Sequence, residues 1–151
     1  MRNLEQPLTE LYTHIIHSDT LNPAVSTVNV GWHIEHSLLV ILKISETVLK
    51  SDPSTYKGTF NWARSLAFMF NSFPRGKGRA PDIVKPKQTV KTDFDTLFAS
   101  VRSTLEQLKR ADDHQYFLHP IFGNLHKKNT FIMLDIHTRH HLKIIRDILS
   151  T

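Results

Sequence analysis

Two histidines near the C-terminus stand four residues apart, His137 and His141 in the stretch DIHTRHHLKIIRDIL. Four residues is close to one turn of an α-helix, so the two imidazoles would project from the same face of a helix. Two neutral imidazoles placed in this way can bind one divalent ion, with about 2.0–2.1 Å between zinc and each nitrogen. The spacing therefore indicates part of a metal site.

These two histidines also lie on the apolar side of the predicted helix. Counted at helical spacing, they share a stripe with aliphatic residues, and His140 lies on the flank of that stripe; the aliphatic residues are Leu134, Ile145 and Ile148. Burying two imidazoles among aliphatic side chains costs free energy unless their nitrogens have partners. A metal ion would be one partner. Hydrogen bonds to other side chains, or a position at a solvated end of the helices, are the alternative.

A third ligand would have to come from another helix, and the segment NVGWHIEHSL offers His33 and His36. Helical periodicity counted from Val30 places His33 closer to the centre of the apolar stripe, and His36 near its edge beside Val40. Periodicity alone favours His33 without excluding His36.

A third motif, HPIFG, begins at His119, and its Pro120 and Gly123 indicate a tight turn. His119 could be a structural corner that packs against Phe122, or it could contact a substrate. The sequence alone does not choose between these two roles.

The basic residues are concentrated in one segment, because residues 74–91 hold six of them against Asp82 alone, while the rest of the chain has equal numbers of both signs. Arg75, Lys77 and Arg79 could receive an anionic thiol or an acidic substrate, or the segment could be a solvated run of charge. Nucleic-acid binding is disfavoured, since the basic residues are confined to one loop and are not interleaved with aromatic ones.

Helical periodicity predicts the elements that would position these residues. Helices are expected at about 3–18, 29–50, 61–73, 92–110 and 129–150, with Thr92 as the N-cap of the fourth. No segment shows the alternation typical of a strand. The prediction is an all-α protein: a four-helix bundle with one additional short helix (61–73) and a long basic loop, in a single domain spanning residues 1–151.

Composition narrows the class of protein. With 40% hydrophobic and 22% charged residues, the chain is typical of globular proteins. It has no apolar run of membrane-spanning length, and MRNLEQPL lacks the apolar region of a signal peptide, so we expect a cytoplasmic protein without a membrane partner. The absence of cysteine excludes disulfides, thiolate metal ligands and cysteine nucleophiles.

Three motifs resemble, in order, those of the DinB-like (YfiT-like) four-helix-bundle superfamily: NVGWHIEHSL, HPIFG and HTRHHLKII, which together span about residues 29–145. The likeness is closest to uncharacterised branches with an HPxFG turn and an HxxHH helix. The resemblance implies a divalent metal bound by three histidines. The family pattern, set on Asn29-Val30, selects His36 as one ligand, and its HxxxH motif corresponds to His137 and His141.

The resemblance also implies a function. Some members of the superfamily are thiol-dependent S-transferases or isomerases, so this chain is expected to be a metal-dependent transferase or hydrolase acting on a small molecule. The metal would be Zn, Ni or Fe, and a low-molecular-weight thiol is the expected co-substrate. His33 and His140 stand as alternate ligands or as partners of the ligands, and no catalytic residue is assigned.

The alternative is a helical-bundle interaction protein without a functional metal. In that case the aromatic-rich segment NWARSLAFMFNSF (61–73) would present an exposed apolar face. The same segment could instead complete the core or form a homodimer interface. We expect a homodimer and no nucleic-acid partner.

Overall fold

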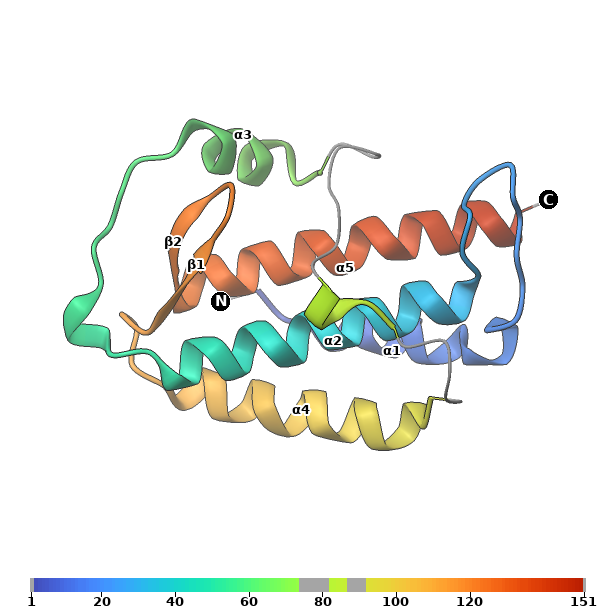
Figure 1. Cartoon of the computed structure of the whole chain (residues 1–151), viewed down its shortest axis with the longest axis horizontal. Helices are drawn as coiled ribbons and strands as arrows, with labels where there is room; N and C mark the ends of the chain where they lie inside the picture. The colour runs from blue at the N-terminus through green and yellow to red at the C-terminus, as the bar shows by residue number, and fades with distance from the viewer. Residues whose placement is uncertain (1, 74–81, 87–91, 151) are drawn as a thin grey trace.

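The computed structural model describes residues 2–73, 82–86 and 92–150, which form a mostly helical fold (Figure 1). The helices are α1 (Glu5–Thr13), α2 (Val30–Lys50), α3 (Trp62–Phe70), α4 (Phe94–Arg110) and α5 (Lys127–Leu149). The strands are β1 (Tyr116–His119) and β2 (Gly123–His126). Short 3-10 turns lie at Ile15–His17, Pro53–Thr55 and Asp82–Val84. The prediction of a mostly helical protein is confirmed.

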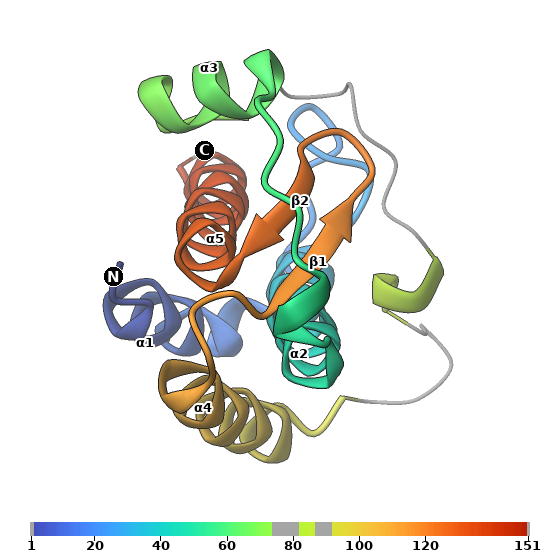
Figure 2. The ribbon, with the colours of Figure 1, turned by 90° about the vertical axis from the view of Figure 1, so that its left-hand side faces the viewer.

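Helices α1, α2, α4 and α5 run roughly along the long axis of the molecule (Figures 1 and 2). Helix α2 packs against both α4 and α5, and α1 packs against α5. Helix α3 lies outside this group and touches α5. The side-by-side packing of α2 and α5 is what matters for the histidines, because these two helices carry them.

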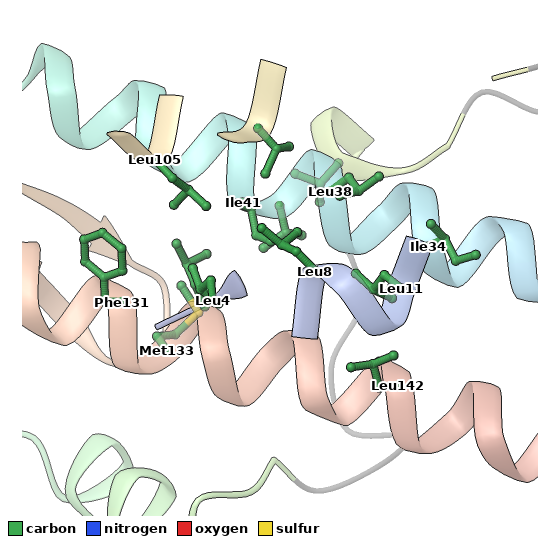
Figure 3. Packing of buried hydrophobic residues seen from close by; sticks show 14 of the residues in the cluster. Leu4, Leu8, Leu11, Ile34, Leu38, Ile41, Leu105, Phe131, Met133 and Leu142 are labelled. Carbon is green, nitrogen blue, oxygen red and sulfur yellow. The ribbon is translucent and has the colours of Figure 1, made fainter. Parts of the chain in front are cut away.

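The apolar stripes predicted from periodicity meet between these helices. Figure 3 shows leucine and isoleucine side chains of α1, α2 and α4 lining the space between the helices, together with Phe131, Met133 and Leu142 of α5. These side chains are almost completely buried, and burying each one contributes about 1.5–3 kcal/mol relative to leaving it in water. The core fixes the rotation of α2 and α5 about their axes, and so decides which other side chains face each other.

Local signals explain where the helices begin. The Asn29 side chain caps α2 by accepting a hydrogen bond from the backbone N–H of Trp32. The backbone of Gly31 lies close to that of Ser18, and a Cβ atom at this position would lie only 3.0 Å from the Ser18 carbonyl oxygen. The prediction of Thr92 as the cap of α4 is wrong, because Asp93 accepts from the Thr96 N–H instead. The Thr92 hydroxyl instead donates to the Glu35 carboxylate of α2.

The two-stranded sheet is a correction to the all-α prediction. Strands β1 and β2 pair antiparallel, with Tyr116 opposite His126 and His119 opposite Gly123. Each strand has four residues, so alternation shows at only two inward positions, Phe117 and Leu125, which is too little for a period of two to stand out. Gly123 closes the turn with φ +68°, a conformation that glycine adopts without strain.

Helix α3 also differs from its prediction. It ends at Phe70, since Asn71 adopts the left-handed conformation at φ 50° and stops the helix before residue 73. None of its residues is buried, and Trp62, Met69 and Phe70 are largely exposed. One face of the segment is therefore open to solvent, while Ala67, Phe68 and Phe73 pack against the core.

Within the described residues, no helix is both long and apolar enough to cross a membrane. Arg75, Lys77 and Arg79 lie outside the described residues, so their predicted contact with a substrate stays a prediction.

Candidate metal centre

Three histidines from two helices converge in the interior. His36 of α2 and His137 and His141 of α5 each offer one ligand atom, and these three atoms all lie within 4.8 Å of one another. The i, i+4 spacing on α5 brings the rings of His137 and His141 to a centroid separation of 4.6 Å. The ring of His36 lies 4.8 Å from that of His141 and 5.2 Å from that of His137. This is the ligand set that the family resemblance implies.

The site is largely shielded from solvent, and His137 is its partly exposed member. His36 and His141 are 4% and 8% exposed. The Nδ1 atom of His137 is inaccessible to solvent and has no hydrogen-bond partner among the described residues. A buried nitrogen without a partner costs free energy, so the arrangement fits an additional group that would bind these nitrogens. Imidazole nitrogen is a preferred ligand of Zn, Ni and Fe, so a divalent transition-metal ion is such a group.

Hydrogen bonding orients His36 toward the other two ligands. Its Nδ1 lies 2.8 Å from the backbone carbonyl oxygen of Val84, in the short segment 82–86. A carbonyl can only accept, so Nδ1 carries the proton and the lone pair is on Nε2. The ring of Trp32, one turn earlier on α2, stacks on that of His36 at 4.8 Å with an interplanar angle of 17°. The hydrogen bond from Nδ1–H to the Val84 carbonyl is typical of a metal-binding histidine, which usually donates its second N–H to a carbonyl, a carboxylate or water.

Burial keeps these imidazoles neutral. Desolvation lowers the pKa of His137 and His141 well below the usual value for histidine, and the neighbouring imidazoles lower both further. Desolvation also lowers the pKa of His36, although its hydrogen bond to the Val84 carbonyl acts in the opposite direction. All three rings are therefore deprotonated at neutral pH, the form in which histidine binds a metal.

His33 is not one of the three clustered histidines, so the cluster includes His36, which the family pattern selects, and not the histidine that periodicity favoured. Its Nδ1 lies 3.0 Å from Nδ1 of His141, and its Nε2 lies 3.0 Å from the Ser26 hydroxyl. Burial, together with the nearby His36 and His140, lowers its pKa to about 4. His33 is thus a partner of the cluster.

His140 also lies beside the cluster. Its ring centroid is 5.3 Å from that of His141, and it contributes to lowering the pKa of His33, His137 and His141. Like His33, it is not a member of the three-histidine group.

His119 forms the structural corner that was one of its two predicted roles. Its Nδ1 accepts hydrogen bonds from the backbone N–H groups of Ile121 and Phe122, both at 3.1 Å, and its ring stacks on Phe122 at 4.4 Å. Burial lowers its pKa to about 4. His119 also lowers the pKa of His137, so it lies within electrostatic range of the site, and a contact with substrate stays a prediction.

Two parts of the site were not predicted from the sequence, the Val84 carbonyl and Trp32. The Val84 carbonyl belongs to the backbone, and every residue carries such a group. Trp32 could have been found, since it precedes His36 by four residues on a predicted helix and must share a face with it.

No protein family, curated protein or solved structure that was compared with this chain matches it. The geometry and chemistry of the cluster are therefore the basis for the proposals below.

Proposed function

We propose that this protein binds a divalent transition-metal ion through His36, His137 and His141. The observation that carries the proposal is the convergence of three neutral, shielded imidazoles, one of which has a buried nitrogen without a partner. A bare cluster of this kind would leave lone pairs facing one another in the interior, and a cation removes that cost. Zn, Ni and Fe all suit three imidazole nitrogens.

The proposed activity is metal-dependent chemistry on a small molecule, either S-transfer from a low-molecular-weight thiol or hydrolysis. When bound, a divalent ion held by three neutral ligands would lower the pKa of a coordinated thiol or water. The residues of the chain hold the site in shape: Val84 orients His36, the helical spacing aligns His137 with His141, and Trp32 covers one face of the His36 ring.

We also propose that the chain is a DinB-like four-helix bundle, in which α1, α2, α4 and α5 are the four helices. Two observations support this assignment. The motifs NVGWHIEHSL and HTRHHLKII lie on adjacent helices, α2 and α5, and their histidines meet. The HPIFG motif forms the turn of the hairpin that precedes α5.

Elemental analysis of protein purified without a histidine tag tests the metal site. Stoichiometric metal in the wild type, and its loss in H137A and H36A, would support the proposal. H17A is a matched control, because His17 is exposed and far from the cluster in sequence. Circular dichroism establishes that each variant is folded. A wild-type protein that takes up no Zn, Ni or Fe after loading would overturn the metal and enzyme proposals together.

A second candidate function is self-association through the apolar surface formed by Phe60, Trp62, Leu66, Met69 and Phe70, here named the α3 surface. Phe60, Trp62 and Phe70 are 72%, 72% and 69% exposed. Since an aromatic side chain buries about 150–250 Å² when fully covered, these three expose roughly 300–500 Å². A standard interface buries about 800 Å² per partner, of which a little over half is apolar. The α3 surface is thus large enough for one half of a dimer interface.

Charge and rigidity favour a second copy of this chain as the partner. Arg64 is the one charged residue between residues 58 and 73, so two α3 surfaces would meet without repulsion. The Arg64 guanidinium donates to the backbone carbonyls of Thr59, Phe122 and Asn124 and so holds α3 against the hairpin. A surface held in place loses little conformational entropy on association.

Sedimentation velocity tests this second candidate. We expect a dimer for the wild type and a monomer for the double variant W62S/M69S. L118S is the control, because Leu118 is 72% exposed but lies on strand β1. A wild-type monomer at every soluble concentration would overturn the homodimer.

A further inference from the structure

The contact between His33 and His141 constrains the protons on both rings. Two Nδ1 atoms 3.0 Å apart form a hydrogen bond when one of them carries a proton and the other presents a lone pair. His33 is 4% exposed and His141 is 8% exposed, so water does not readily replace this bond. The direction of the bond decides whether Nε2 of neutral His141 carries a proton or a lone pair.

In one arrangement His33 donates. Nδ1–H of His33 then points at Nδ1 of His141, and the proton of neutral His141 is on Nε2. His141 then has no free lone pair, because Nε2 is protonated and Nδ1 accepts the hydrogen bond from His33. This tautomer is incompatible with His141 as a ligand.

In the other arrangement His141 donates. Its Nδ1–H points at Nδ1 of His33, and its Nε2 lone pair is free. His33 then carries its own proton on Nε2, which lies 3.0 Å from the Ser26 hydroxyl oxygen. That oxygen also accepts the Val28 backbone N–H at 3.2 Å, so it is already placed as an acceptor. The chain from His141 through His33 to Ser26 is then satisfied at each step.

We propose that His33 is a positioning residue for the metal centre: it accepts the Nδ1–H of His141, is itself held by Ser26, and so presents Nε2 of His141 to the ion. The inference rests on the proposed metal site. In this arrangement His33 is the hydrogen-bond partner of His141, as the Val84 carbonyl is the partner of His36. Such partners of metal-bound histidines are usually carboxylates, backbone carbonyls or water.

The partners of nearby carboxylates explain why an imidazole can have this role. Glu35, beside His36 on α2, accepts a hydrogen bond from Thr92. Asp135 on α5 pairs with Arg2 and Arg139. These two carboxylates are therefore engaged elsewhere, and the side chain of His33 lies within hydrogen-bond distance of Nδ1 of His141.

Two substitutions of His33 separate positioning from packing. H33L has similar volume and removes the acceptor. H33N is smaller and keeps an amide oxygen near the position of Nδ1. We expect H33L to weaken Zn²⁺ affinity by about 10–100-fold, measured by competition with a chromophoric chelator, and H33N to recover most of that loss. S26A should have a smaller effect in the same direction, because it acts through His33.

Two spectroscopic readouts report on the ligand itself. Nitrogen-15 NMR of the Zn²⁺-loaded protein should show His141 protonated on Nδ1, with that proton protected from exchange in the wild type and in H33N but not in H33L. The absorption spectrum of the Co²⁺-loaded protein reports the coordination number of the ion, which should be the same in the wild type, H33N and H33L. Thermal unfolding of the metal-free proteins measures any loss of packing.

The outcomes separate this inference from the metal site. Wild-type protein without metal would overturn the proposed function. Stoichiometric metal in the wild type with equal Zn²⁺ affinity in H33L would overturn the role of His33 alone. Weak binding in both H33L and H33N would assign His33 to packing, and a lower Co²⁺ coordination number in H33N would make His33 a ligand. Either result would also overturn the inference.

Discussion

The interior between α2 and α5 and the outer face of α3 depart from ordinary burial in opposite directions. In the interior, four imidazole rings lie close together, those of His33, His36, His137 and His141. On α3, apolar side chains such as Trp62 and Phe70 face water. Each departure costs free energy in the isolated chain, and a group bound at either place would lower that cost. A cation would lower the cost of the buried imidazole nitrogens, and contact with another apolar surface would lower the cost of the exposed side chains of α3.

The largest difference between the two regions should appear in the matched pair Met133 and Met69. Met133 is 2% exposed in the core and Met69 is 68% exposed on α3. We expect M133A to lower the free energy of unfolding by about 2–5 kcal/mol, because it leaves a cavity. M69A should change it by less than about 0.5 kcal/mol. Urea unfolding of both variants measures this, and equal losses would show that α3 is part of the core.

Metal should stabilise the protein through the interior site alone. Free Zn²⁺ at 100 times its dissociation constant would add about 2.7 kcal/mol. For a chain of this size that corresponds to a rise in Tm of roughly 5–10 °C. Differential scanning fluorimetry with and without a chelator measures the rise. H137A should show no rise while W62S/M69S keeps it, and a rise that survives in H137A would place the bound metal elsewhere.

The hairpin lies between the two regions, and His119 makes its stability depend on pH. Burial lowers the pKa of His119 to about 4 from a usual value of 6.5. The unfolded chain therefore binds a proton first, and stability falls as pH decreases from about 6.5 toward 4. The loss from His119 should reach about 2 kcal/mol at pH 5.

The variant H119N isolates this contribution, because an amide oxygen can still accept the two backbone N–H groups while the titrating ring is gone. Urea unfolding of the metal-free protein at pH 7.5 and pH 5 should give a shallower pH dependence for H119N than for the wild type. An unchanged dependence would assign the acid sensitivity to the other buried histidines.

The smallest effect should come from loosening α3. Arg64 is the cation that connects this helix to the hairpin, through carbonyls of Phe122 and Asn124. R64K cannot reproduce the forked donor geometry, so α3 should open more often, with a local cost of about 1 kcal/mol. Hydrogen exchange measured by mass spectrometry should be faster in peptides of α3 and unchanged in peptides of α2 and α5. Equal acceleration everywhere would mean that Arg64 supports the whole fold.

Helical periodicity was sufficient to predict that these five helices exist, because an apolar stripe repeats the same signal, but α1 and α3 have only nine residues each and are shorter than predicted. It failed for the hairpin, whose strands each have four residues. It also left open whether the residues of α3 face the core or solvent, because an apolar stripe does not tell which element covers it. Leu66, Met69 and Phe70 have the spacing of a core helix and still face outward.

For the site, the sequence by itself determined the pair His137 and His141, since helical spacing places them on one face whatever the rest of the chain does. Whether His33 or His36 joins the cluster was decided by tertiary structure, because it depends on how α2 is rotated against α5, which the packing of the whole core sets. Tertiary structure also sets the hydrogen bonds of the ring nitrogens. The Val84 carbonyl is 48 residues from His36, and the Ser26 hydroxyl is seven residues from His33. Spacing along a helix is local geometry, whereas the direction in which an imidazole presents its lone pair depends on neighbours that only folding brings near.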